Sequence, residues 1–321
     1  MQLLSFENIL ELDISPQTIY SWICQSISQK NDTILPPKIS LKPEDEVFYN
    51  FMPSILLKEE SAGLKIVNRY PNRSPVLDSQ IFLYNIKNGN LECIMDGNFI
   101  TAMRTGAIAT HSIISFAKND FNSLSFIGVG IQARATLKIF SCIYDKRDLV
   151  IKVKKYKDQH LDFIAFAKQL LPQSTQYIIC NTYDECVENT DIVISSVTYF
   201  ENDICSDDKF SNGCLVVPIH TRGFTNCDLF FDKVYVDDLG HVSGFKHFNK
   251  FQNKAIETAS YIKSPIELGR KSQLEKIICY NIGLSIHDLF IAKNIHKLAI
   301  ANNVGQRISM SVPNTKFWLE K

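Results

Sequence analysis

Apolar positions are spaced differently in the two halves of this 321-residue chain. In the first half, short apolar runs predict strands, and apolar residues at helical spacing predict helices. Strands are expected at residues 38–41, 47–51, 63–68, 80–86 and 91–95, a helix from Pro16 behind the cap residue Ser15, and a longer helix over residues 98–118. Asn88-Gly89 is typical of a tight hairpin turn. The first part is therefore expected to be an α+β domain.

From residue 124 onward, strand-like and helical segments alternate. Strands are expected at residues 124–127, 149–153, 176–180, 191–196, 214–219, 233–236 and 276–280, and a last helix over residues 283–301. Such alternation predicts the α/β fold class with a Rossmann-type doubly wound parallel sheet. We expect residues 113–302 to form this second domain. Residues 1–112 would form the first, with the polar segment 303–321 folded back onto it.

Residues 126–133 carry the most informative motif, G-x-G-x-x-A between a strand and a helix. In this context Gly128 permits a tight turn, Gly130 lets the backbone approach a pyrophosphate, and Ala133 lets the helix pack closely on the strand. The phosphates would lie at the helix N-terminus, where free N–H groups favour anions. The expected cofactor contacts in this turn are Gly128, Val129, Gly130, Ile131 and Gln132. The alternative is an ordinary glycine-rich turn.

Composition narrows the class of protein. The 34 basic and 34 acidic residues cancel, so there is no electrostatic reason to expect nucleic acid or an acidic membrane as a partner. Nine scattered cysteines, none in C-x-x-C, favour reduced thiols over disulfides or a zinc site. No apolar run approaches the length of a membrane span, and the histidines show no metal-ligand spacing. We therefore expect a cytoplasmic protein without a metal.

Several separated segments together resemble the ornithine cyclodeaminase/μ-crystallin family. They are residues 52–54 (MPS), 63–68 (GLKIVN), 102–107 (AMRTGA), the glycine turn, 269–270 (GR) and 280–288 (YNIGLSIHD), in the family's order. The resemblance implies a homodimer, with residues 1–112 and 303–321 forming a substrate-binding and dimerisation domain and residues 113–302 the dinucleotide-binding domain. It also implies nicotinamide-dependent chemistry at the α-carbon of an amino acid or the matching imine. Thr105, Ser196, Val197 and Asn281 are expected beside the cofactor.

Basic residues of the first part are the candidate substrate contacts. A carboxylate is best held by a bidentate guanidinium, and Arg104, at the start of the long helix, is the candidate. Lys65 lies in a strand otherwise apolar, and we expect it to contact the reacting nitrogen or the carboxylate, with proton transfer if burial lowers its pKa. The resemblance adds Lys38 as a third basic contact, and we place Met52 in the same site. The alternatives are a surface helix salt bridge for Arg104, an edge-strand lysine at position 65 and a solvated lysine at position 38.

The family's cyclodeaminases place an aspartate just after the fifth sheet strand, but this chain has no acid at residues 219–223. Arg222 falls nearest that position, and His220 precedes it. A cyclodeaminase needs the carboxylate to orient and deprotonate the substrate ammonium, so conversion of ornithine to proline is disfavoured. We expect Arg222 to suit a second substrate carboxylate and His220 to shuttle protons. The alternative is that Arg222 pairs with Asp228 or another acid and that His220 is a loop residue.

Lysines follow the second strand of the second domain, where NAD-binding folds commonly place an acid on the ribose. Lys154 and Lys155 would suit a 2′-phosphate, which favours NADP over NAD, unless they are simply solvated. The predicted function is that of an NAD(P)-dependent amino-acid dehydrogenase or imine reductase with a small-molecule substrate. The alternatives are an ornithine cyclodeaminase-type ammonia lyase and a non-catalytic ligand-binding protein similar to μ-crystallin. Retention of both Lys65 and Arg104 favours the enzyme.

Overall fold

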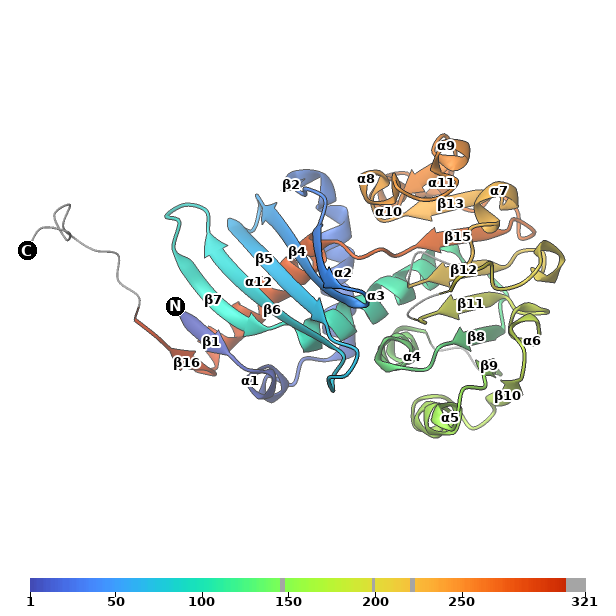
Figure 1. Cartoon of the computed structure of the whole chain (residues 1–321), viewed down its shortest axis with the longest axis horizontal. Helices are drawn as coiled ribbons and strands as arrows, with labels where there is room; N and C mark the ends of the chain where they lie inside the picture. The colour runs from blue at the N-terminus through green and yellow to red at the C-terminus, as the bar shows by residue number, and fades with distance from the viewer. Residues whose placement is uncertain (145–147, 198–199, 220–222, 310–321) are drawn as a thin grey trace, which may run out of the picture.

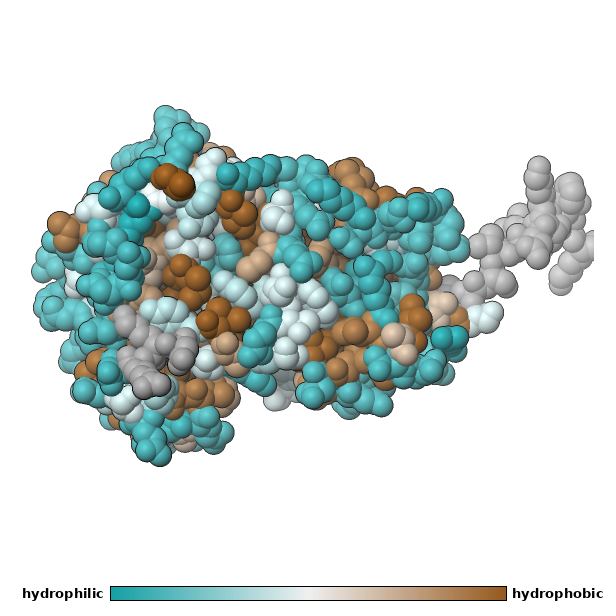
Figure 2. Space-filling model, turned by 180° about the vertical axis from the view of Figure 1, so that it is seen from behind, coloured by the Kyte–Doolittle hydropathy of each residue, from teal (hydrophilic) through white to brown (hydrophobic). Residues whose placement is uncertain are grey.

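The computed structural model describes residues 1–144, 148–197, 200–219 and 223–309. Figure 1 shows two parts side by side, each built on its own β-sheet, with the long helix α3 (Asn98–Phe116) running from one to the other. Within these ranges no helix is long and apolar enough to cross a membrane. On the side seen from behind, hydrophobic residues gather in small groups among hydrophilic ones (Figure 2).

The first sheet is mixed, with the strand order β16-β1-β7-β6-β5-β4-β2 and with β3 paired to β4. Its strands are β1 (Gln2–Leu4), β2 (Thr33–Ile34), β3 (Ile39–Glu44), β4 (Val47–Leu56), β5 (Ser61–Arg69), β6 (Leu77–Asn85), β7 (Leu91–Asp96) and β16 (Gln306–Arg307). The five predicted strands are present as β3 to β7. Of the segment 303–321 that is predicted to fold back, the described part pairs with β1, with Arg307 opposite Gln2. The Asn88-Gly89 turn spans residues 86–90 and is longer than the predicted tight turn.

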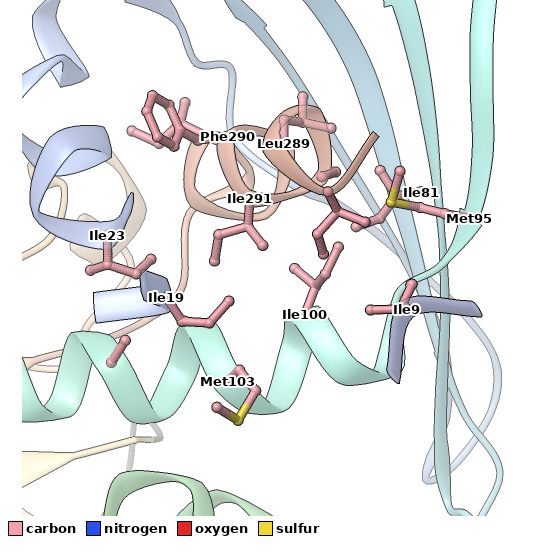
Figure 3. Packing of buried hydrophobic residues seen from close by; sticks show 14 of the residues in the cluster. Ile9, Ile19, Ile23, Ile81, Met95, Ile100, Met103, Leu289, Phe290 and Ile291 are labelled. Atoms are coloured by element: carbon pink, nitrogen blue, oxygen red, sulfur yellow. The ribbon is translucent and has the colours of Figure 1, made fainter. Parts of the chain in front are cut away.

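Helices cover one face of this sheet. They are α1 (Phe6–Glu11), α2 (Pro16–Ser28), α3 and α12 (Ser285–Ala301), with a short 3₁₀ turn at Lys30–Asp32. α2 begins as predicted, because the Ser15 Oγ accepts a hydrogen bond from the Thr18 N–H at 3.1 Å. Figure 3 shows apolar side chains of these helices and of the sheet meeting in one buried cluster, among them Ile19, Ile81, Ile100, Leu289 and Ile291.

The last helix lies in this first core. α12 contacts β4, β5 and β6, and its side chains Leu289 and Ile291 are fully buried there. The boundary expected at residue 303 groups this helix with the second domain instead. The helix follows the last strand of the second sheet along the chain, but its apolar residues have their buried partners on the first sheet.

The second sheet is built from parallel pairs in the order β10-β9-β8-β11-β12-β15-β13-β14. Its strands are β8 (Ser123–Ile127), β9 (Val150–Lys154), β10 (Gln176–Cys180), β11 (Ile192–Ser195), β12 (Leu215–Pro218), β13 (Lys233–Val236), β14 (Ala255–Glu257) and β15 (Ile277–Tyr280). The predicted fold class is confirmed, and the short β14 is an addition to the predicted strands. The strand order changes direction between β8 and β11, the point at which such sheets bind ligands.

The remaining helices of the second part are short, apart from two. They are α4 (Ile131–Ile143), α5 (Gln159–Leu170), α6 (Tyr183–Val187), α7 (Cys227–Phe230), α8 (Leu239–Val242), α9 (Phe248–Phe251), α10 (Thr258–Lys263) and α11 (Pro265–Leu268), with a 3₁₀ turn at Asp207–Lys209. α4 and α3 cross closely, since a Cβ on Gly106 would lie 2.5 Å from the Ala135 backbone. α3 also contributes Ile100 to the first core and Phe116 to the second. This crossing fixes the start of α3 relative to the glycine turn that begins α4.

Candidate active site

The glycine turn joins β8 to α4 and has the geometry that a diphosphate requires. Gly128 has a φ of +83°, and a Cβ there would lie 2.9 Å from the backbone of Ser196 and Val197, so a side chain does not fit. A Cβ on Gly130 would meet no heavy atom within 4 Å, so the space beside it is open. Gly130 is the N-cap of α4 and offers no side-chain cap, which leaves the first N–H groups of the helix free for an anion.

A cavity of about 470 Å³ opens beside this turn. Seven of the expected cofactor residues line it: Gly128, Val129, Gly130, Lys154, Lys155, Ser196 and Val197. Three others, Thr105, Gln132 and Asn281, line a neighbouring cavity. Ile131 lines neither of the two and is 66% exposed. The structure therefore places seven of the expected cofactor contacts around this groove and three in the adjoining cavity, with Ile131 outside both.

The neighbouring cavity, of about 490 Å³, lies between the two parts. Its lining includes the four expected substrate residues, Lys38, Met52, Lys65 and Arg104. Met52 and Lys65 are opposite each other on β4 and β5, while Arg104 comes from α3. Ser196 and Val197, just after β11, line both cavities, so the groove along the glycine turn leads directly to the basic residues.

A buried ion cluster forms the floor of this second cavity. Asp288 Oδ1 lies 2.8 Å from Lys65 Nζ and 3.2 Å from Arg104 Nε. The side chains of Lys65 and Asp288 are 1% and 0% exposed, and that of Arg104 is 12% exposed. Charged groups are rarely buried to this extent unless they are paired. The structure therefore contradicts both alternatives weighed for these residues, since Lys65 lies on β5 between two other strands and Arg104 is largely buried.

Burial and pairing set the charges of the cluster. Burial lowers the pKa of Lys65 to about 8, although the Asp288 carboxylate opposes the shift. Burial also opposes ionisation of Asp288, but Lys65 and Arg104 outweigh it and hold the pKa of Asp288 below its usual value. Asp288 Oδ2 is buried and has no partner among the described residues. Lys65 can therefore exchange a proton near neutral pH while Asp288 stays ionised.

The outer nitrogens of the Arg104 guanidinium have no hydrogen-bond partner among the residues that the structure describes. Its Nε donates to Asp288, and a Cβ on Gly283 would lie 2.6 Å from its Nη1. Gly283 has a φ of +90°, and its N–H donates to Asp237 Oδ2 at 2.7 Å. This tight turn packs against the guanidinium, and two Nη atoms of an arginine are the pair that can bind a carboxylate in a bidentate manner.

Lys38 lines the same cavity just before β3, and the described residues form no hydrogen bond or ion pair with it. Burial lowers the pKa of Lys38, Asp237 raises it, and Arg104 lowers it further. The mutual effect of Lys38 and Arg104 means that two cations face one region of the cavity. An anion bound there would relieve their repulsion.

Two candidates cannot be placed: His220 and Arg222 lie outside the described residues. Their neighbour Ile219 lines the same cavity as Lys65 and Arg104. Asp228, the suggested partner of Arg222, is fully buried and its Oδ1 accepts a hydrogen bond from the Tyr280 hydroxyl at 2.6 Å.

Sequence reasoning missed two acids. Asp288 holds both basic groups, and Asp237, directly after β13, holds the Gly283 turn. Burial raises the pKa of Asp237 to about 6. The signal for Asp288 was its place inside an apolar helical stretch, where an acid needs a partner. In the part of the chain that is described, no group of three His, Cys, Asp or Glu side chains is arranged to hold a metal ion.

The sequence as a whole matches a known family. The model of the ornithine cyclodeaminase/mu-crystallin family matches residues 22–303. The chain belongs to this family.

One family relative is a Delta(1)-pyrroline-2-carboxylate reductase of Bacillus cereus, 24% identical over 86% of this chain and 89% of the relative. Among solved structures of the family fold, the Thermococcus litoralis Delta(1)-pyrroline-2-carboxylate reductase in complex with NADH and L-proline has a TM-score of 0.83 at 21% identity, and covers 96% of this chain and 100% of its own. An archaeal alanine dehydrogenase dimer with bound NAD has a TM-score of 0.84 at 20% identity, covering 97% and 99%. These likenesses establish the fold.

Proposed function

We propose that this protein is an NAD(P)-dependent oxidoreductase that transfers a hydride at the α-carbon of an amino acid or the matching imine. One observation carries the proposal: the cavity with Lys38, Lys65 and Arg104 is continuous with the groove of the glycine turn. Such continuity lets a nicotinamide and a carboxylate-bearing substrate meet. The Bacillus cereus relative and the two solved structures carry names of this reaction class, which supports the proposal.

The substrate carboxylate would bind the free Nη atoms of Arg104 and the ammonium of Lys38. Both groups line the cavity. Among the described residues, Lys38 has no ion pair, and Arg104 is paired through its Nε only. Because the cavity is partly closed to water, a bidentate pair there holds the α-carbon in one orientation. Met52, opposite Lys65, would limit the room for the side chain.

Lys65 would hold the proton that the reaction adds or removes. When a nicotinamide is bound, its C4 supplies or accepts the hydride. Reduction of a C=N bond also requires a proton at the nitrogen, and the Lys65 ammonium has one to give at neutral pH because its pKa is about 8. In the oxidative direction, neutral Lys65 takes the proton back.

For the cofactor, we favour NADP over NAD. Lys154 ends β9 and, with Lys155, lines the groove where the adenosine ribose would lie, and no acid occupies that strand end. A 2′-phosphate would find cations there instead of a repelling carboxylate. The two solved structures hold NADH and NAD, so the preference needs a direct test.

We also infer a homodimer that joins through the first sheet. On the face of this sheet that the helices do not cover, one row of side chains contains Pro53, Leu64, Phe82 and Ile94, which lie side by side on β4 to β7. They alternate with the row Met52, Lys65, Ile81 and Met95 that faces the interior. A half-exposed apolar row across four strands suits a second copy, and the archaeal neighbour is named a dimer. Residues 1–112 and 303–321, joined by α12, would then serve substrate binding and dimerisation.

A cytoplasmic location remains our inference from the cysteines, all nine of which are free thiols.

The proposal is tested by screening amino acids with NAD and NADP, and keto acids with amines or cyclic imines with NADH and NADPH, following nicotinamide absorbance. We expect turnover of a carboxylate-bearing imine. Ornithine serves as the control substrate, and we expect no proline from it because residues 219–223 hold no acid. Formation of stoichiometric ammonia and proline from ornithine would instead identify the protein as a cyclodeaminase. Nucleotide binding without any turnover would make it a binding protein.

A further inference from the structure

Arg69 lines both cavities, and sequence reasoning gave it no role. It ends β5, two and four residues after Val67 and Lys65, and alternation along a strand puts the three side chains on one face. Its side chain is 17% exposed. The first part of the molecule therefore presents a guanidinium at the junction between the nucleotide groove and the substrate cavity.

The turn between β3 and β4 holds this guanidinium in place. Arg69 Nη1 donates to the backbone carbonyl of Glu46 at 2.6 Å. Glu46 Oε1 is 4.0 Å from Nη2, beyond hydrogen-bond range, and 70% exposed. Glu46 has a φ of +65°, a conformation that side chains disfavour, so the fold sustains a strained turn here. In Figure 1 this turn lies on the side of the first sheet that faces the second part.

The hydrogen bond to Glu46 occupies only one of the nitrogen atoms of the Arg69 guanidinium. Arg69 has no further hydrogen-bond partner among the described residues, so Nε and Nη2 remain available. The same groove contains Gly128 and Gly130, whose turn offers only neutral N–H groups to a diphosphate with two negative charges. A cation opposite that turn would neutralise the diphosphate charge that the neutral N–H groups of the turn leave uncompensated.

We propose that Arg69 binds the diphosphate of the dinucleotide from the side opposite the glycine turn. This inference rests on the proposed nucleotide site. It makes the substrate-binding part a direct contact of the cofactor, so that nucleotide binding draws the two parts together across the groove. Arg69 would then set nucleotide affinity and contribute little to the choice of substrate.

A second substrate carboxylate is the competing ligand, because Arg69 also lines the substrate cavity. The charges argue against it. Arg104 and Lys38 already supply that cavity with free cationic donors, whereas the glycine turn supplies none. The diphosphate has the greater need of a guanidinium.

The test compares two ligands that contain the diphosphate with one that lacks it. NADH, ADP-ribose and adenosine are each titrated into the wild-type protein, Arg69→Gln and Arg69→Lys, and their dissociation constants are measured. The control is Arg307→Gln, which makes the same change at an exposed position in a strand on the far edge of the first sheet. We expect Arg69→Gln to weaken the binding of NADH and ADP-ribose about tenfold or more, the scale of one hydrogen bond to a charged group. Adenosine affinity should stay unchanged, Arg69→Lys should be intermediate because it keeps the charge without the fork, and Arg307→Gln should match wild type.

Three results would overturn the inference. Equal loss of affinity for adenosine would make Arg69 a support of the β3–β4 turn. Unchanged nucleotide affinity with altered preference between mono- and dicarboxylic substrates would assign Arg69 to the substrate. Failure of the wild-type protein to bind NADH at all would instead overturn the proposed function, and this inference with it.

Discussion

The nucleotide groove and the substrate cavity adjoin each other but are built on different principles. The groove depends on backbone, since Gly128 and Gly130 lie in one turn and leave N–H groups free at the start of α4. The cavity depends on side chains from three distant segments, with Lys65 on β5, Arg104 on α3 and Asp288 on α12. The groove is open to solvent at its lysines, whereas the ion cluster is buried.

The two sites should tolerate substitutions differently. A backbone site fails when a side chain enters the space reserved for its ligand, and the fold can survive. A buried charge cluster fails as a unit, because removing one partner leaves another charge buried and uncompensated. Substitutions in the groove should therefore change ligand affinity without changing the stability of the fold. Substitutions in the cavity should change both ligand affinity and stability.

The largest effect is expected from Lys65→Met. Without the proton donor, kcat should fall about 10²- to 10⁴-fold, the usual contribution of a general acid, while NADH affinity stays the same. The matched control is Lys58→Met, because Lys58 is 59% exposed and pairs with Asp32 at the surface. Retention of most of the wild-type kcat, in a protein that still melts cooperatively, would remove Lys65 from the chemistry.

Gly130→Asp is expected to have the next largest effect. A Cβ at Gly130 meets nothing within 4 Å, so the protein should fold normally, but the carboxylate would oppose the diphosphate and weaken nucleotide binding roughly 100-fold or more. Gly128→Ala is the contrast. Its φ of +83° and the contacts at 2.9 Å predict a loss of stability of about 1–3 kcal/mol, visible in denaturant unfolding. Unchanged titration of Gly130→Asp with NADH and NADPH would move the site away from this turn.

The same contrast explains what the sequence could predict. The G-x-G-x-x-A turn is local, so its strand, its helix and its open Gly130 follow from eight consecutive positions. The central strands of the second sheet, such as Leu215–Pro218, are fully buried runs that stand out by their apolar residues. β1 and β16 could not be predicted because each is too short to show an alternation of apolar and polar residues.

The ion cluster was only half predictable. The residue types and the resemblance single out Lys65 and Arg104, but the partner they share is Asp288, more than 180 positions away from either along the chain. Only the docking of α12 on β4 to β6 brings that carboxylate beneath them. For the same reason, a boundary drawn along the sequence separates α12 from the core that it completes.

Arg104→Ala tests the proposed carboxylate clamp. Loss of a desolvated bidentate contact costs roughly 2–5 kcal/mol, so kcat/KM should fall about 30-fold or more while nucleotide affinity is unchanged. Gly283→Ala should act in the same direction, since its Cβ would lie 2.6 Å from Arg104 Nη1. If Arg104→Ala kept its kcat/KM for a carboxylate substrate but lost NADH, the guanidinium would belong to the cofactor instead.

The pH dependence of reduction should report Lys65. Its pKa of about 8 keeps the ammonium below that pH, so kcat/KM for imine reduction should be level near neutrality and fall about tenfold per unit above pH 8. Amino-acid oxidation, which needs the neutral amine, should rise over the same range. Asp288→Asn removes the carboxylate that favours the ammonium and should move the descending limb to lower pH. A limb that stays in place in Asp288→Asn would assign the titration to another group.

The smallest effect is expected at the lysines of the groove. Lys155 is exposed, and Lys154 is half-buried with its Nζ 5.1 Å from the centre of the Tyr183 ring. Exposed charge pairs contribute about 1 kcal/mol or less, so the preference for NADPH over NADH should be about fivefold or smaller and should shrink as salt is added. The double variant Lys154→Glu, Lys155→Glu should reverse the order, because two carboxylates would then face the ribose. A wild-type protein that prefers NADH at low salt would show that these lysines are solvated side chains without a phosphate to bind.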